Sequence, residues 1–361
     1  MSATLPEFPW DTLTEARAVA EAHPDGIVDL SVGTPVDPVA PLIREALASA
    51  SASPGYPTTA GTPTLRQSMV AALGRRYGVT KLSKAAVLPV IGTKELIAWL
   101  PTLLALGAAD LVVVPELAYP TYEVGARLAG APVLRADSLT QLGPQSPALV
   151  YLNSPSNPTG RVLGVDHLRK VVGWARERGA LVVSDECYLG LGWDTEPVSL
   201  LHPLVCDGDH TGLLAAHSLS KSSSLAGYRA GFVAGDPVVI AELLAVRKHA
   251  GMMVPTPVQA AMVAALDDDA HEHEQRDRYA RRRAALLPAL RAAGFTVDHS
   301  EAGLYLWVTR GQPCRDTVDW LAQRGILTAP GEFYGPAGAR HVRVALTATD
   351  ERIAAAVDRL S

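Results

Sequence analysis

Residues 213–221, with the sequence LLAAHSLSK, contain a short apolar run that ends in a polar turn. The run 213–216 has the length and composition of a buried strand. Ligands bind at the carboxyl ends of strands in open α/β sheets, and Lys221 follows such an end. A lysine amine can form an imine with an aldehyde, and Ser218, Ser220 and Arg229 can hold a phosphate through charge-assisted hydrogen bonds. The alternative is a polar loop with a solvated lysine, because serine and lysine are common loop residues.

Similar apolar runs, separated by stretches of helix length, occur on both sides of this segment. This alternation is typical of a mostly parallel sheet with helices on both faces. The predicted fold class is therefore α/β, with a large domain of this kind plus a smaller α+β domain. We predict further strands at 111–114, 148–152, 181–184 and 230–234, and helices at 95–106, 120–128 and 166–178.

The pattern changes after about residue 240, which indicates a second domain. Longer helices, a charged run and two alternating segments, 304–308 and 342–346, follow that point. The proline-rich start of the chain predicts an extended arm with one short helix near 12–22. We predict three parts: an N-terminal arm that joins the small domain (1–40), the large domain (41–240) and the small C-terminal domain (241–361).

Composition excludes several classes of protein. The 32 Lys and Arg against 37 Asp and Glu give a net charge of -5, without a long basic stretch, so we expect no nucleic-acid partner. Three widely spaced cysteines, Cys187, Cys206 and Cys314, fit neither a disulfide framework nor a Cys-x-x-Cys site. No signal segment and no apolar run of about 18 residues occurs. We therefore expect a cytoplasmic protein without a membrane partner.

Two other strand ends carry polar residues suited to a ligand. Asp185 follows the predicted strand 181–184, and its carboxylate can pair with a protonated pyridine nitrogen, cap a helix or bind a metal. Asn157 lies in the turn-rich segment 153–160 (NSPSNPTG), where its amide can face a ligand oxygen or serve an ordinary turn.

The segment Gly92-Thr93-Lys94 precedes an apolar helix. Free amides at a helix start, together with the helix dipole, form a phosphate-binding cup, and glycine lets the ligand approach closely. Thr93 is equally suited to cap the helix with no ligand present. The sequence leaves both interpretations open at this point.

These pieces, in this order, resemble the fold-type I pyridoxal-phosphate enzymes, specifically the class I/II aminotransferases. The resemblance extends from Gly33 to Arg343 and implies pyridoxal 5'-phosphate as the cofactor of the large domain. It implies that Lys221 forms the Schiff base and that Asp185 pairs with the pyridine nitrogen. The other cofactor-binding positions that it implies are Gly92, Thr93, Lys94, the stacking ring of Tyr119, the phenolic-oxygen donors Asn157 and Tyr188, and the phosphate ligands Ser218, Ser220 and Arg229.

The resemblance also implies how the substrate binds. Arg343, on the predicted strand 342–346, looks like the arginine that grips the α-carboxylate, a role suited to a planar fork of donors. Gly33 would offer backbone close to the same carboxylate, and Asn157 would lie beside it. Tyr56 resembles a catalytic tyrosine that reaches the phosphate of the neighbouring subunit, which implies a homodimer with shared active sites.

The implied activity is transfer of an amino group from glutamate to an oxo acid. Within the family the chain looks similar to actinobacterial N-succinyldiaminopimelate aminotransferases, whose acceptor is N-succinyl-2-amino-6-oxopimelate in lysine and diaminopimelate biosynthesis. Such an acidic acceptor needs a second cation, and the candidates are Lys94, Arg66, Lys248 and Arg247. The alternatives are an aminotransferase for another oxo acid, of aspartate, alanine or aromatic type, and a pyridoxal-phosphate carbon–sulfur lyase.

Two unrelated interpretations are weaker. Ser218-x-x-Lys221 matches the Ser-x-x-Lys pattern of penicillin-recognising enzymes, but no Lys-Thr-Gly follows it. His271 and His273 are of a residue type that binds metals, yet residues two apart on a helix point in different directions. We predict a solvated, charged helix face there and no metal site.

Overall fold

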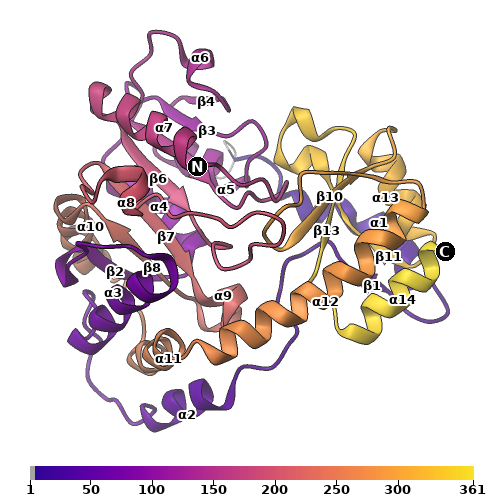
Figure 1. The fold of residues 1–361 in the computed structure, drawn as a ribbon, viewed down its shortest axis with the longest axis horizontal. Coiled ribbons are helices and arrows are strands. Elements are labelled where there is room, and N and C mark those ends of the chain that lie inside the picture. Colours follow the sequence, from indigo (N-terminus) through magenta and orange to yellow (C-terminus); the bar gives the residue numbers. More distant parts are fainter. Residues whose placement is uncertain (1–4) are drawn as a thin grey trace.

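The computed structural model describes residues 5–361, and its largest element is a seven-stranded sheet (Figure 1). The strand order is β2-β8-β7-β6-β5-β3-β4, and only β8 runs antiparallel to its neighbours. The predicted α/β class is confirmed. In sheet order the strands are β2 (Val87–Ile91), β8 (Ala230–Gly235), β7 (Leu213–Ser218), β6 (Leu181–Asp185), β5 (Leu149–Asn153), β3 (Val112–Val114) and β4 (Val133–Arg135).

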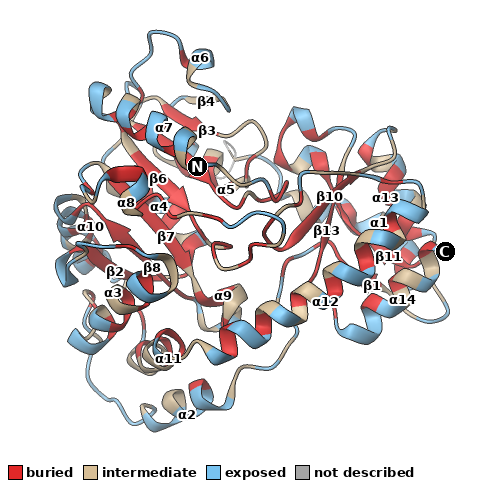
Figure 2. Ribbon diagram, viewed as in Figure 1, coloured by how far each residue is buried: buried red, intermediate tan, exposed pale blue. Residues whose placement is uncertain are grey.

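Helices cover both faces of this sheet, and its central strands are buried (Figure 2). On one face the core includes side chains of α2, α3, α7 and α11, and on the other face those of α4, α5 and α10. The helices of this part are α2 (Pro41–Ser49), α3 (Pro63–Tyr77), α4 (Thr93–Leu103), α5 (Thr121–Leu128), α6 (Leu139–Leu142), α7 (Val165–Arg178), α8 (Pro203–Cys206), α9 (Leu219–Ser222), α10 (Pro237–Ala250) and α11 (Thr256–Asp267).

A second, antiparallel sheet with the order β12-β13-β10-β9 forms the other body of the molecule (Figure 1). The short strand β1 of the arm pairs in parallel with β11, at Val28 and Ile326. This pairing supports the division 1–40, 41–240 and 241–361, which we retain as a proposal. The remaining α-helices and strands are α1 (Thr14–Glu21), β1 (Val28–Asp29), α12 (Ala270–Ala292), β9 (Thr296–Asp298), β10 (Tyr305–Thr309), α13 (Cys314–Ala322), β11 (Ile326–Leu327), β12 (Ala329–Pro330), β13 (Val342–Ala345) and α14 (Asp350–Leu360).

The first turn of α12 corrects one prediction. His271 and Glu272 are buried and do not form a solvated face. The ring of His271 lies 2.7 Å from Asp268 Oδ2 and 2.8 Å from Ser223 Oγ, and Glu272 pairs with Arg76 at 2.7 Å. His273 and Glu274 of the same turn are exposed, so the predicted solvated face holds for them and fails for the two residues that find partners within the protein. Residues 5–361 contain no His, Cys, Asp and Glu cluster suited to a metal and no helix long and apolar enough to cross a membrane.

Candidate active site

A cavity of about 690 Å³ lies where the carboxyl ends of β5, β6 and β7 face the second sheet. Gly92 is the residue directly before Thr93, which lines the cavity. Tyr56 does not line it, and the side chain of Tyr56 is 98% exposed. The cavity brings together the other predicted site residues, which are Gly33, Thr93, Lys94, Tyr119, Asn157, Asp185, Tyr188, Ser218, Ser220, Lys221, Arg229 and Arg343.

Lys221 reaches the cavity from a short helix that begins where β7 ends. The hydroxyl of Ser218 caps this helix by accepting a hydrogen bond from the Ser220 amide at 3.1 Å. Lys221 Nζ donates to the carbonyl oxygen of Gly33. Burial lowers the pKa of Lys221, which increases the fraction of neutral amine near neutral pH. A neutral amine is the form that attacks an aldehyde or accepts a proton.

Asp185 ends the neighbouring strand, β6, and its carboxylate is held by fixed donors. Tyr122 Oη donates to Asp185 Oδ2 at 2.8 Å, and the amide of Cys187 donates to Oδ1 at 3.2 Å. Burial raises the pKa of Asp185, while the hydrogen bonds from Cys187 and Tyr122 oppose that rise. Within residues 5–361 this carboxylate has no cationic partner closer than 4.0 Å. A protonated pyridine ring in the cavity would provide one.

Two cations lie beside the start of α4. Gly92, at φ 74°, caps this helix, and a Cβ at this position would overlap the Arg229 guanidinium. Burial and the nearby charge of Arg229 lower the pKa of Lys94. In the described part of the chain neither Lys94 nor Arg229 forms an ion pair. Free helix amides and the Arg229 guanidinium without a carboxylate partner suit a dianionic phosphate.

Arg343, which β13 holds in a buried position, also lines the cavity. Arg343 Nη1 donates to Asn157 Oδ1 at 2.8 Å, and Nη2 donates to the carbonyl of Ser31 at 2.6 Å. Its guanidinium lies 3.9 Å from the centroid of the Tyr305 ring, and its Nε has no hydrogen-bond partner among the described residues. A buried guanidinium with only neutral neighbours suits a carboxylate ligand.

Some cavity residues were not predicted. Tyr305 Oη lies 3.0 Å from Tyr188 Oη, and a Cβ on Gly33 would overlap the same hydroxyl of Tyr305. Phe8 and Trp10 of the arm also line the cavity. The alternation of 304–308 predicted a strand that includes Tyr305, but nothing local indicates which of its side chains faces a ligand.

The comparisons with known proteins agree with this geometry. The family model for aminotransferase class I and II matches residues 25–360, so the chain belongs to this family, whose members depend on pyridoxal phosphate. The predicted enzyme class and cofactor are thereby confirmed.

Individual relatives share nearly the whole chain. A probable aminotransferase of Mycobacterium tuberculosis is 83% identical over 361 residues, which are 100% of this chain and 86% of that protein. The 4-dedimethylamino-4-oxo-anhydrotetracycline transaminase of Streptomyces rimosus is 60% identical over 99% of both chains. The structure of a probable N-succinyldiaminopimelate aminotransferase from Thermus thermophilus is similar with a TM-score of 0.87 and 28% identity, covering 98% of this chain and 99% of that one.

Proposed function

We propose that this aminotransferase moves the amino group of glutamate to N-succinyl-2-amino-6-oxopimelate, with Lys221, Asp185 and Arg343 as its principal site residues. The observation that carries the site assignment is that Lys221 and Asp185, from neighbouring strands, line one cavity with Arg229 and Arg343.

The residues present fit pyridoxal phosphate in one orientation. Arg229 and the backbone amides of Thr93 and Lys94 at the start of α4 would hold its phosphate, together with Ser218 and Ser220. Asp185 would face the ring nitrogen, Tyr119 would cover the ring, and Asn157 and Tyr188 would donate to its phenolic oxygen. When bound, this group supplies an aldehyde and an electron-withdrawing ring.

The chain's own groups then have distinct roles. Arg343 would bind the α-carboxylate of the substrate through its two-pronged guanidinium, assisted by the backbone of Gly33. Lys221 Nζ would be covalently bonded to the aldehyde carbon of the cofactor in the resting enzyme. After release it would accept the proton from the substrate's α-carbon. Asp185 would keep the ring nitrogen protonated, and the buried walls would exclude water from the reacting atoms.

The acidic acceptor is supported by the position of Lys94. Of the four candidate cations, only Lys94 lines the cavity. Arg247 is fully buried and paired with Glu95 at 2.8 Å, so it has a structural partner already. Lys94 Nζ lies 5.5 Å from the centroid of the Phe8 ring, at the side of the cavity that the arm forms. The named activity of the Thermus neighbour agrees with such an acceptor.

A second candidate acceptor is a large aromatic ketone. Phe8 and Trp10 give the cavity an apolar wall, and the Streptomyces relative is named for a transamination of this kind of compound. Flat aromatic surfaces bind well against such side chains. A glutamate-coupled panel of oxo compounds separates the two candidates: a higher kcat/KM for the succinylated acceptor supports our proposal, and a higher value for the polycyclic ketone contradicts it.

We expect Lys94→Gln to lower kcat/KM for the succinylated acceptor by roughly 10- to 150-fold, because a charged hydrogen bond is lost. The value for pyruvate, which has no distal carboxylate, should change much less. The measurement is steady-state kinetics at saturating cofactor. Lys248→Gln, which removes an exposed lysine outside the cavity, is the matched control. An equal decrease in kcat/KM for both acceptors would show that Lys94 does not recognise the distal carboxylate.

We also propose a homodimer with shared active sites, supported by the exposed side chain of Tyr56. Tyr56 is 98% exposed and lies in an exposed loop, which suits a contact with a second subunit. Light scattering should therefore give a molar mass of twice the 38.1 kDa of one chain. A single-chain mass at micromolar concentration would contradict this proposal.

A further inference from the structure

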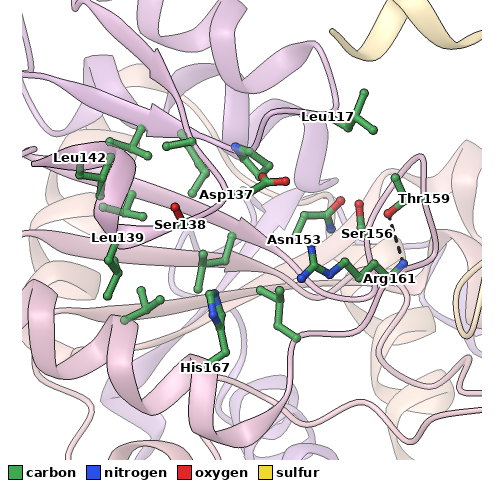
Figure 3. A pocket seen from close by; sticks show the side chains of 18 of the residues that line it. Leu117, Asp137, Ser138, Leu139, Leu142, Asn153, Ser156, Thr159, Arg161 and His167 are labelled. Atoms are coloured by element: carbon green, nitrogen blue, oxygen red, sulfur yellow. Dashed lines mark hydrogen bonds between the residues drawn. The ribbon is translucent and has the colours of Figure 1, made fainter. Parts of the chain in front are cut away.

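A second cavity, of about 120 Å³, lies between the sheet and the helices α6 and α7 (Figure 3). It shares no lining residue with the larger cavity described above. The segment 153–161, which presents Asn157 to the larger cavity, contributes Asn153, Ser156, Thr159 and Arg161 to this second one.

The inner wall of the second cavity is apolar and its rim is basic. Leu142, Val150 and Val171 are buried side chains of the inner wall. Arg161, which is exposed, and His167, which is half-buried, are both among the lining side chains of this cavity (Figure 3). An apolar interior with a few convergent polar groups is the usual composition of a small-molecule site.

The charges at the rim favour an anion. Within residues 5–361 the guanidinium of Arg161 has no hydrogen-bond or ion-pair partner. The carboxylate of Asp137 is the acid in the wall, and its Oδ1 already accepts a hydrogen bond from the amide of Glu116 at 2.9 Å. Burial, and then the charges of Arg161 and Lys170, lower the pKa of His167, while the carboxylate of Asp137 opposes this shift. A bound anion beside Arg161 would act on His167 in the same direction as Asp137.

We propose that this cavity is a second ligand site, which takes a small carboxylate with an apolar body. The carboxylate binds Arg161 and His167, and the body fills the space beside Val150 and Val171. Its small volume limits the body to about one ring or a branched aliphatic chain.

The position of the site couples it to the active site through Asn153. Asn153 Nδ2 donates to the carbonyl of Asp185 at 2.8 Å, and Oδ1 accepts from the amide of Asn157 at 2.7 Å. Asn157 in turn accepts a hydrogen bond from Arg343. A ligand that contacts Asn153 and Arg161 therefore touches the segment that positions Asn157.

Calorimetric titration of the cofactor-loaded enzyme with phenylacetate tests the site. The Arg343→Gln background removes carboxylate binding at the proposed active-site arginine. In that background we expect phenylacetate to bind, and neutral phenylacetamide to bind with a Kd at least about tenfold higher. Addition of Arg161→Gln should raise the Kd of phenylacetate by about tenfold or more. Lys170→Gln, which removes a nearby charge outside the cavity, is the matched control and should bind as before.

Kinetics provide a second readout that needs no Arg343 variant. With both substrates saturating, phenylacetate should change kcat of the native enzyme but not of Arg161→Gln. The proposed site would be overturned if phenylacetate did not bind, or if phenylacetamide bound with the same affinity. It would also be overturned if Arg161→Gln and Lys170→Gln lowered the affinity for phenylacetate equally. Binding without a change in kcat would overturn its coupling to Asn157. Failure of the succinylated acceptor leaves these results unaffected, because the titration needs no substrate and the kinetic readout can use any oxo acid that the enzyme accepts.

Discussion

Lys221→Ala is expected to lower the rate of transamination by roughly 10²- to 10⁴-fold or more, because in our proposal one amine would serve as both nucleophile and base. The side chain lines the same cavity as Asp185, and burial lowers its pKa so that the neutral amine is available. The measurement is a single-turnover reaction with glutamate, followed through the cofactor absorbance.

Added methylamine provides the control for Lys221→Ala. A small amine can occupy the vacated space and accept the α-proton, so it should restore part of the rate in a concentration-dependent way. Lys221→Arg should stay inactive and without rescue, since a guanidinium fills the space and does not deprotonate. Normal turnover by Lys221→Ala without added amine would show that another group performs the proton transfer.

Asp185→Asn is expected to lower kcat by roughly 30- to 5,000-fold, the range for removing one member of a buried charge pair. Asparagine has nearly the same shape and can still accept the hydrogen bond from Tyr122, so the fold should persist. The loss should fall on kcat more than on KM, because Arg343, which would bind the α-carboxylate, is unchanged. Steady-state kinetics at saturating cofactor measure both constants.

Tyr122→Phe is the matched comparison for Asp185→Asn. It removes one hydrogen bond to the carboxylate and keeps the charge, so its effect on kcat should be much smaller, about 2- to 13-fold. Similar losses in the two variants would indicate that Asp185 acts through its hydrogen bonds and not through its charge.

The central sheet could be predicted from sequence where its strands are buried on both sides. The runs at 149–153, 181–185 and 213–218 are continuous and apolar, and each was predicted to within two residues. The strands β2 and β4 were not predicted. β2 is an edge strand that contains Pro89, and β4 has only three half-buried residues, so neither has a clear periodic pattern.

Most of the candidate site could be located for a related reason. Lys221, Asp185 and Asn157 each lie close to the carboxyl end of a strand, and parallel strands bring those ends to one edge. Tyr305, Phe8 and Trp10 could not be found in this way, because they reach the cavity from the second sheet and the arm. Their positions depend on how distant segments pack, which local patterns do not encode.

The most direct test of the account is to reduce the cofactor-loaded enzyme with borohydride and map the attached pyridoxyl group by peptide mass spectrometry. We predict that the added mass lies on the peptide that contains Lys221, and at residue 221 within it. Attachment to Lys94, the other lysine in the cavity, or to any lysine elsewhere would contradict the proposed site.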